Sequence, residues 1–240
     1  MELAEVVGQL AGLRRFPVRS LSGETPDECL MQGGGLVGDR VYEMVEIESG
    51  TVLSARTAPL LLRYRARYLD AMVRPGDLEP WIRIRTPDGS EVPLSDRSWI
   101  DDISRRCDRP VTLRLREGAD GDPAPVHLIS VPTIRFLEKQ YGGTLEPVRL
   151  RSNLLLDLPD ARPFEEDRWL GRKIWIGDAL LEIVRQCEFC VVPSLDAETP
   201  ERSPGILNAI VRGRGGFIGV RARALTGSRM RLGDPIAIVD

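Results

Sequence analysis

The stretch KIWIGDALLEIV, residues 173–184, contains two apolar segments on either side of the turn dipeptide Gly177-Asp178. β-branched and aromatic residues favour strands, and glycine with aspartate favours a tight turn, so this stretch predicts two strands joined by a turn. The same pattern of strand residues bounded by turn residues recurs at 41–47, 51–54, 81–85 and 235–239. Strands therefore dominate the expected fold.

Only three helices are expected, and two of them have a serine suited to cap them. Ser95 would cap the first helix, and Ser130 would cap the second, which Gly142 would end. Each has apolar residues at helical spacing, namely Trp99, Ile103 and Cys107 in the first and Ile134, Leu137 and Tyr141 in the second. A third, shorter helix is expected at 204–211. Many strands with few helices are typical of a barrel or a sandwich.

Size, charge and cysteine usage limit the classes of protein to consider. A chain of 240 residues holds one large core or two smaller ones. Its 33 basic and 36 acidic residues give a net charge of −3, which argues against broad binding of nucleic acid or anionic membrane. The start lacks the pattern of a signal peptide, no apolar run approaches the roughly 20 residues of a membrane span, and four cysteines are too few for a disulfide scaffold. We therefore expect a cytoplasmic protein.

The polar helix at 95–107 and the loop at 118–123 form the best candidate for a boundary between two lobes. We accordingly expect an N-terminal lobe at 1–105 and a C-terminal domain at 106–240. The single histidine, His127, excludes a zinc site with three histidines and the HExxH arrangement of metalloproteases.

The pair Cys187 and Cys190 is the strongest local feature, and it allows several interpretations. A redox pair usually lies at a helix N-terminus, which Pro193 and its β-branched neighbours disfavour here. A zinc site needs further ligands, but Cys29 and Cys107 stand alone in the sequence. Two possibilities remain open: both cysteines are buried as small hydrophobic residues, or one thiolate binds a metal that accepts soft ligands.

Glycines and arginines gather in three N-terminal segments, which are Phe16–Ser20, Gly34–Arg40 and Ser54–Arg56. Glycine lets a backbone approach a ligand closely, and arginine matches phosphate oxygens with two parallel hydrogen bonds. These segments therefore indicate a possible anion site. The alternative is that the glycines only make turns and the arginines form surface ion pairs.

The segment 149–157 offers Arg151 and Asn153, which would share one face of a strand and reach one ligand together. The alternative is a polar strand face with an apolar reverse. The acidic segment 163–169 follows, and its carboxylates would either orient the arginines or solvate a loop.

Taken in order, these segments resemble the MOSC family, the fold of the molybdenum cofactor sulfurase C-terminal domain. The likeness is greatest to members with an N-terminal β-barrel extension, such as the mitochondrial amidoxime reducing component and its bacterial relatives. It rests on FPVRS, GLVGDR, SAR with a following proline, RLRSN, FEEDRW, the cysteine pair and the final GDP. The resemblance implies a mainly β fold, with a MOSC-type β-barrel, an N-terminal β-barrel-like lobe and a few short helices.

The resemblance also implies a site. It places a molybdenum cofactor (molybdopterin) between the lobes, with Cys190 as the metal ligand and catalytic residue. The cofactor would then contact Arg19, Ser20, Arg40, Arg56, Arg151 and Asn153. Both the phosphate and the pterin of such a cofactor suit these side chains, because arginine binds phosphate and an amide binds a heterocycle edge.

The chain departs from the family pattern at several positions. Arg19 replaces a lysine, and Pro123-Ala124 replaces small hydroxyl residues near the cofactor. Arg221 replaces an aromatic residue, where a permanent positive charge would favour an anionic substrate. Strand alternation instead favours a simpler interpretation, in which Arg221 and Arg223 share one face and meet water.

The resemblance implies an oxidoreductase that reduces N-hydroxylated or N-oxide substrates, which are small molecules. The chain has no recognisable flavin or iron–sulfur motif, so a separate electron-donor protein would supply the electrons. Two alternatives stay open. One is a sulfur carrier with a persulfide on Cys190 and no cofactor, and the other is a cofactor carrier without redox turnover of its own.

Overall fold

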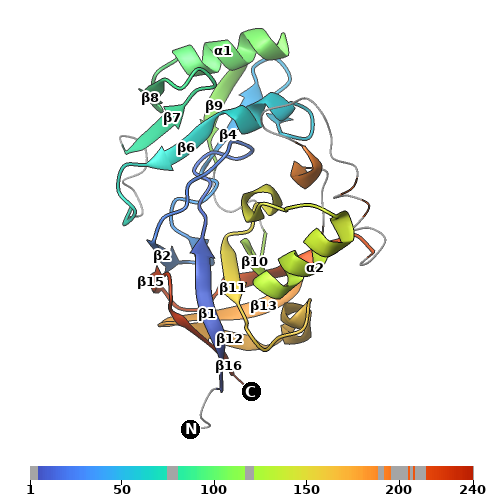
Figure 1. Ribbon diagram of the computed structural model, residues 1–240. Coiled ribbons are helices and arrows are strands. Elements are labelled where there is room, and N and C mark those ends of the chain that lie inside the picture. The colour runs from blue at the N-terminus through green and yellow to red at the C-terminus, as the bar shows by residue number, and fades with distance from the viewer. Residues whose placement is uncertain are drawn as a thin grey trace.

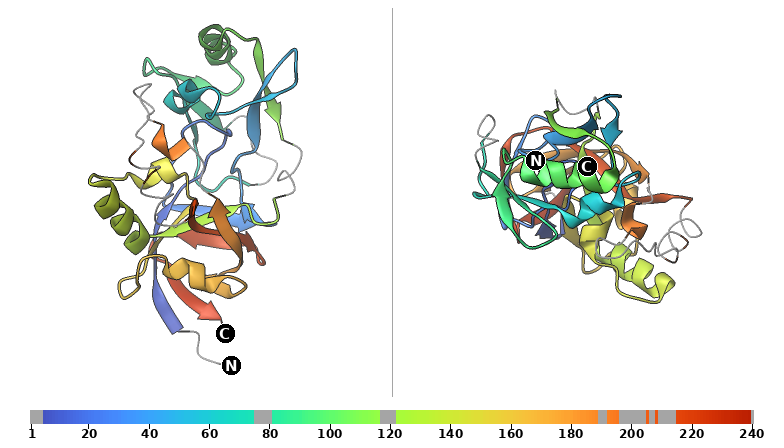
Figure 2. Two further views of the ribbon diagram at one scale, coloured as in Figure 1. Left: turned by 90° about the vertical axis from the view of Figure 1, so that its right-hand side faces the viewer. Right: turned by 90° about the horizontal axis from the view of Figure 1, so that it is seen from above.

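The computed structural model describes residues 5–74, 81–116, 122–188, 192–195, 205, 208 and 215–239. The fold is mainly β, as predicted, and consists of a closed barrel below a second lobe (Figure 1). Figure 2 shows the same arrangement from the side, with α1 on the upper lobe, α2 flanking the barrel and the two chain ends at the far end of the barrel.

Seven strands close the barrel in the order β1-β11-β10-β14-β13-β12-β16. Their bounds are β1 (Glu5–Leu13), β10 (Val126–Ser130), β11 (Leu154–Asp157), β12 (Lys173–Ile176), β13 (Ala179–Glu188), β14 (Phe217–Ala224) and β16 (Pro235–Val239). The stretch 173–184 forms the predicted antiparallel pair, with Ile176 opposite Ala179. Gly177 turns the chain with φ +56°, and a Cβ atom there would lie 2.7 Å from the Asp234 carboxylate, so this turn needs glycine.

Alternate residues of the hairpin formed by β12 and β13 point into the barrel core. Ile174 and Ile176 point inward from β12, and Leu181 and Ile183 point inward from β13, all with no exposed surface. Burying one such side chain stabilises the fold by roughly 1.5–3 kcal/mol. The hairpin therefore contributes its whole apolar face to the barrel.

The upper lobe contains two three-stranded sheets around a separate core. One sheet has the order β5-β4-β9 and the other the order β6-β7-β8. Their bounds are β4 (Tyr42–Glu46), β5 (Val52–Leu53), β9 (Val111–Leu115), β6 (Arg65–Tyr68), β7 (Ile82–Arg85) and β8 (Glu91–Pro93). Helix α1 (Ser98–Cys107) and the 3-10 turn η1 (Pro59–Arg63) close this core, in which Trp99 and Tyr64 are fully buried.

The two lobes exchange strands. Residues 5–13 belong to the barrel and residues 111–115 to the upper sheet, while β2 (Glu28–Gln32) lies between β3 (Gly35–Leu36) and the C-terminal β15 (Ser228–Arg231). The division of the chain into 1–105 and 106–240 stays a prediction. The chain alternates between the two cores, because Leu13, Cys29 and Leu36 lie in the barrel core whereas Val18, Leu21 and Tyr42 lie in the core of the upper lobe.

The second helix is confirmed together with both of its caps. In α2 (Val131–Tyr141), the Ser130 hydroxyl accepts a hydrogen bond from the Thr133 amide, and Gly142 ends the helix with φ +78°. The third expected helix, at 204–211, lies outside the described residues except for Gly205 and Asn208.

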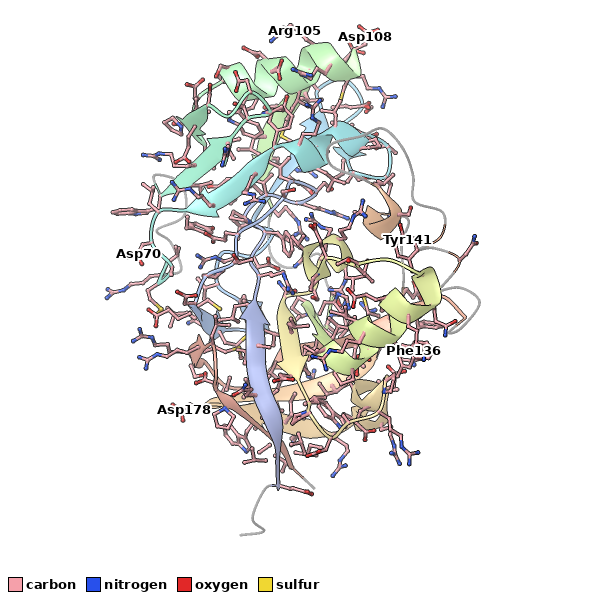
Figure 3. The ribbon with its side chains drawn as sticks, viewed as in Figure 1. Asp70, Arg105, Asp108, Phe136, Tyr141 and Asp178 are labelled. Atoms are coloured by element: carbon pink, nitrogen blue, oxygen red, sulfur yellow. The ribbon has the colours of Figure 1, made fainter. Side chains whose placement is uncertain are left out.

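The cap expected for the first helix was wrong. Helix α1 begins at Ser98 and has Arg97 at its N-cap, and the Ser95 hydroxyl takes no part. The Asp96 carboxylate instead accepts the Ser98 amide at 2.8 Å, and the N-cap lies two residues after the expected one. Asp108 ends the helix with φ +52°, at the pole of the molecule opposite the barrel (Figure 3). In the described residues, no helix is long and apolar enough to cross a membrane.

Candidate functional site

A cleft of about 620 Å³ draws its lining from both lobes. Its walls include residues of β3, β10, β13 and β14 and of the loops that carry the arginine-rich segments. Six arginines line it among the described residues, namely Arg19, Arg40, Arg56, Arg116, Arg151 and Arg221. Three acids line it as well, namely Asp39, Asp122 and Glu188, so the lining carries a formal excess of three positive charges (six minus three).

Five of the seven residues expected at the site line this cleft, namely Arg19, Ser20, Arg40, Arg56 and Arg151. Segments from residues 16–56 and from residues 149–153 therefore meet in space, as expected for one ligand. Cys190 lies outside the described residues.

Three of these residues have a left-handed backbone. Ser20 has φ +71°, and Arg40 and Arg151 both have φ +54°. Among the described residues only Asp108 and Phe164 share this feature without being glycine, and neither of them lines the cleft. A left-handed conformation costs a non-glycine residue about 1–3 kcal/mol, and such strain is concentrated at functional sites. The strain at the cleft lies at the residues that the sequence assigns to the ligand.

Phe16 brings the two segments together. The guanidinium groups of Arg40 and Arg151 lie 4.8 Å and 4.2 Å from the centre of its ring. Cations are attracted to an aromatic face, and Phe16 itself is 1% exposed. Phe16, the first residue of FPVRS, therefore contacts Arg40 of GLVGDR and Arg151 of RLRSN.

Arg40 is held by several further contacts. Its guanidinium pairs with Asp39, donates to the Asn153 side-chain oxygen at 3.2 Å and donates to the Arg151 carbonyl oxygen at 3.1 Å. Asp39 in turn accepts the Phe16 amide at 2.7 Å. This network fixes the guanidinium before any ligand arrives.

Asn153 lies behind the cleft and not in its lining. Its side chain is fully buried, donates to Arg14 and Asp39, and accepts from His127 and Arg40. All the hydrogen-bonding capacity of the amide is thereby used within the protein. In this structure Asn153 supports Arg40, and a direct contact with the cofactor stays a prediction.

The expectation that Arg151 and Asn153 share a strand face was wrong. The 3-10 turn η2 (Pro147–Leu150) precedes them, Arg151 caps it in a left-handed conformation, and β11 begins only at Leu154. Pro147 favours the first turn of a helix, which takes this segment out of the sheet. Arg151 then donates to the Leu21 carbonyl oxygen at 2.8 Å.

Sequence reasoning missed Arg116 and the acid beneath it. Glu43 is 4% exposed and binds Arg19 at 3.3 Å and Arg114, while Arg116 lies 3.7 Å away. Arg116 also donates to the Arg40 carbonyl oxygen at 2.6 Å. The spacing of Arg114 and Arg116, two residues apart next to a strand, was the available signal.

Arg221 does not simply meet water, contrary to the interpretation that alternation favoured. It is half-buried in β14, its Nε lies 3.2 Å from the Cys187 sulfur, and its Nη1 donates to the Pro125 carbonyl oxygen at 3.0 Å. Arg223 does reach the surface, where it pairs with Glu182 at 2.6 Å. The two arginines share a strand face, but only Arg221 contacts Cys187 and Pro125 there, whereas Arg223 extends to the surface.

His127 lines the cleft and stays neutral. Burial lowers its pKa to about 3, and the positive charge of Arg221 adds to the effect. Its Nε2 lies 3.0 Å from the Ile218 carbonyl oxygen and must therefore carry the hydrogen. His127 consequently offers no proton to a ligand near neutral pH.

Cys187 is the only cysteine of the cleft within the described part of the chain, and it lies 5% exposed near the end of β13. Cys29 belongs to the barrel core, where burial raises its pKa to about 12. Cys107 packs against the core of the upper lobe. The described residues contain no group of three or more histidine, cysteine, aspartate or glutamate side chains that could hold a metal ion.

Glu166 of the acidic segment neither orients the arginines nor solvates a loop. It lies in η3 (Glu165–Trp169), is fully buried, and accepts hydrogen bonds from the Ser130 amide at 3.2 Å and hydroxyl at 2.7 Å. Glu166 therefore fixes the start of α2.

Pro123 and Ala124, which depart from the family pattern, do not line the cleft. Their neighbours Asp122 and Pro125 do line it.

Comparison with known proteins agrees with this architecture. The model of the MOSC domain matches residues 116–237, and that of the MOSC N-terminal β-barrel domain matches residues 7–104. No curated protein matches significantly. The solved structure of YuaD from Bacillus subtilis shares the fold, with a TM-score of 0.53, 16% identity and coverage of 96% of this chain and 94% of that one.

Partial matches occur to YiiM from Geobacillus stearothermophilus (20% identity, TM-score 0.40) and YiiM from Escherichia coli (13% identity, TM-score 0.36). They cover 49% and 51% of this chain, which spans only 55% and 58% of those proteins. The two family models together account for most of the sequence, and one of them covers just over half of it. The chain therefore belongs to the MOSC domain family, which is associated with the molybdenum cofactor.

Proposed function

We propose that this protein binds a molybdenum cofactor in the cleft and uses it to reduce N-hydroxylated or N-oxide substrates. The observation that carries the proposal is the convergence of Ser20, Arg40 and Arg151. Two distant segments bring these residues to one cleft, and all three have a left-handed backbone. Family membership supports the choice of cofactor.

The donor set fits a molybdopterin. A terminal phosphate needs charged donors, which Arg40, Arg151 and Arg19 supply, and Ser20 adds a hydroxyl. The volume of about 620 Å³ lies within the range of cofactor pockets. Arg56 is more exposed and would reach the outer edge of the ligand. Cys190 would provide the thiolate for the metal, since soft sulfur ligands suit such a centre.

The protein's own residues bind and orient the reactants. When bound, the cofactor would supply the two-electron chemistry that removes oxygen from the substrate nitrogen. The arginines would hold the anionic cofactor, and the neutral His127 keeps its proton on Nε2, which donates it in a hydrogen bond to the Ile218 carbonyl oxygen. A proton consumed in the reduction must therefore come from another group or from water. A separate electron-donor protein would restore the reduced state.

The test combines metal analysis with turnover. The protein is expressed in a host that makes the cofactor, and molybdenum per protein and oxidised pterin are measured. Reduction of benzamidoxime is then followed with chemically reduced methyl viologen as the electron source. We expect close to one molybdenum per chain and release of benzamidine.

Two outcomes would contradict the proposal. Cofactor without turnover of any hydroxylamine or amidoxime would identify a cofactor carrier. A persulfide on cysteine without molybdenum would identify a sulfur carrier.

A further inference from the structure

We infer that Arg221 binds an anionic group of the substrate, so that this protein prefers N-hydroxylated compounds that bear a carboxylate. The inference rests on the proposed function and names the substrate class of the same cleft. Arg221 comes from β14, on the barrel side of the cleft, and lies beside Cys187.

The contacts of Arg221 fix its guanidinium group and leave some of its N–H donors available to a ligand. A guanidinium has five N–H groups. Nε lies against the Cys187 sulfur, and Nη1 donates one hydrogen to the Pro125 carbonyl oxygen. Within the described part of the chain, Nη2 makes no hydrogen bond. Three N–H groups on Nη1 and Nη2 therefore remain for a ligand, and two of them, one on each nitrogen, can donate parallel hydrogen bonds to a carboxylate.

The charge of Arg221 is not met by a carboxylate in the described residues. Asp122 lines the same cleft but accepts Arg185 at 3.1 Å and 3.2 Å through its two oxygens. His127, opposite Arg221 in the sheet, is neutral. A half-buried cation held only by a carbonyl oxygen and a sulfur has lost part of its hydration without gaining a counter-ion. An anion is the ligand that this arrangement favours.

Arg221 is also separate from the arginines assigned to the cofactor phosphate. Arg40 and Arg151 share the ring of Phe16 and are bonded to each other. Arg221 instead contacts Cys187, three residues before Cys190 in the sequence. Arg221 therefore lies beside Cys187, and the arginines assigned to the phosphate end of the cofactor form a separate set of contacts.

The main experiment compares 4-carboxybenzamidoxime with benzamidoxime on the cofactor-loaded protein. The variant is Arg221→Gln, which keeps polar groups but removes the charge. The matched control is Arg223→Gln, two residues along the same strand, where the guanidinium is exposed and paired with Glu182. We expect the ratio of kcat/KM, carboxylated over neutral, to fall at least about tenfold in Arg221→Gln, the size of one charged hydrogen bond. The ratio should stay unchanged in Arg223→Gln.

A second measurement is independent of turnover. Binding of benzoate and of benzamide to the purified protein is compared by isothermal titration, together with the molybdenum content of each variant. Wild type should prefer benzoate, and Arg221→Gln should lose that preference while keeping its molybdenum.

The outcomes separate this inference from the proposed function. An unchanged substrate ratio in Arg221→Gln, with active enzyme, overturns the role of Arg221 and leaves the reductase intact. Loss of molybdenum in Arg221→Gln also overturns the inference and assigns the residue to the cofactor. A preference for benzoate that depends on Arg221, in a protein that turns over neither amidoxime, supports the anion site and overturns the proposed function. Absence of any preference for benzoate in wild type overturns the inference.

Discussion

Arg40 donates a hydrogen bond from Nη2 to the carbonyl oxygen of Arg151 at 3.1 Å, although 111 residues separate them. Both guanidinium groups lie over the ring of Phe16. The contact joins the loop that enters the upper lobe to the loop that enters β11 of the barrel. The cleft therefore depends on the packing of the lobes against each other, and the following predictions test its parts.

Replacement of Arg40 or Arg151 by alanine should weaken retention of the cofactor more than it lowers the melting temperature. Each change removes charged hydrogen bonds to an anion, worth about 1.5–3 kcal/mol of binding free energy. Molybdenum and pterin content after gel filtration, and melting curves of the same samples, measure the two effects. Arg67→Ala is the control, because Arg67 lies outside the cleft lining and its partly exposed side chain forms an ion pair with Glu91 at the surface. Near-normal cofactor content in both cleft variants would exclude this placement of the cofactor.

Cys190→Ser should abolish activity that depends on molybdenum and leave the fold intact. Serine is a harder and far less acidic ligand than cysteine, so it should not replace a thiolate on the metal. Cys187→Ser is the comparison and should retain much more activity. Activity assays and circular dichroism of both variants provide the readout. Equal losses in the two variants would indicate a disulfide or a shared zinc site.

Asn153→Ala should destabilise the protein and also reduce cofactor retention. The change leaves the Arg14 carbonyl oxygen and the His127 amide without their partner, and each buried polar group left unsatisfied costs about 1–3 kcal/mol. We expect a loss of at least about 2 kcal/mol in the free energy of unfolding, measured with urea. Loss of cofactor at unchanged stability would instead mean that Asn153 contacts the cofactor directly.

His127 should make stability depend on pH from about pH 6.5 down to about pH 3. Its pKa is lowered in the folded state to about 3 from an ordinary value of 6.5, so below pH 6.5 the unfolded chain binds a proton that the folded protein does not. Stability is therefore fully present above pH 6.5 and falls as the pH decreases, with a limiting slope of about 1.4 kcal/mol for each pH unit.

The matched variant for this test is His127→Gln, which keeps a polar side chain without a titrating ring. Urea unfolding at pH 7, 6 and 5 should show a smaller decrease in the variant than in wild type. The carboxylates titrate alike in both proteins, so the difference isolates the histidine. Parallel pH profiles would show that His127 becomes protonated in the folded protein.

The sequence by itself determined the local structure and the chemical content of the site. Gly177-Asp178 between two apolar segments predicted the hairpin of the barrel, and Ser130 with Gly142 predicted both ends of α2. These features depend on backbone preferences and on neighbours within a few residues, so they are readable along the chain. The order of the arginine-rich motifs also indicated which segments would meet, and five of the expected residues line the cleft.

The tertiary structure alone decided which way the polar side chains face. Alternation places Arg221 and Arg223 on one face of β14, but contacts with Cys187 and Pro125 partly bury the first and leave the second at the surface. Glu166 is likewise buried by a contact that is distant in sequence, because its carboxylate accepts a hydrogen bond from Ser130 at the start of α2. The residue pattern of a strand predicts which side chains share a face, but it does not predict which other segments pack against that face. The fate of a polar residue depends on partners more than 30 residues away, which only the folded chain brings into contact.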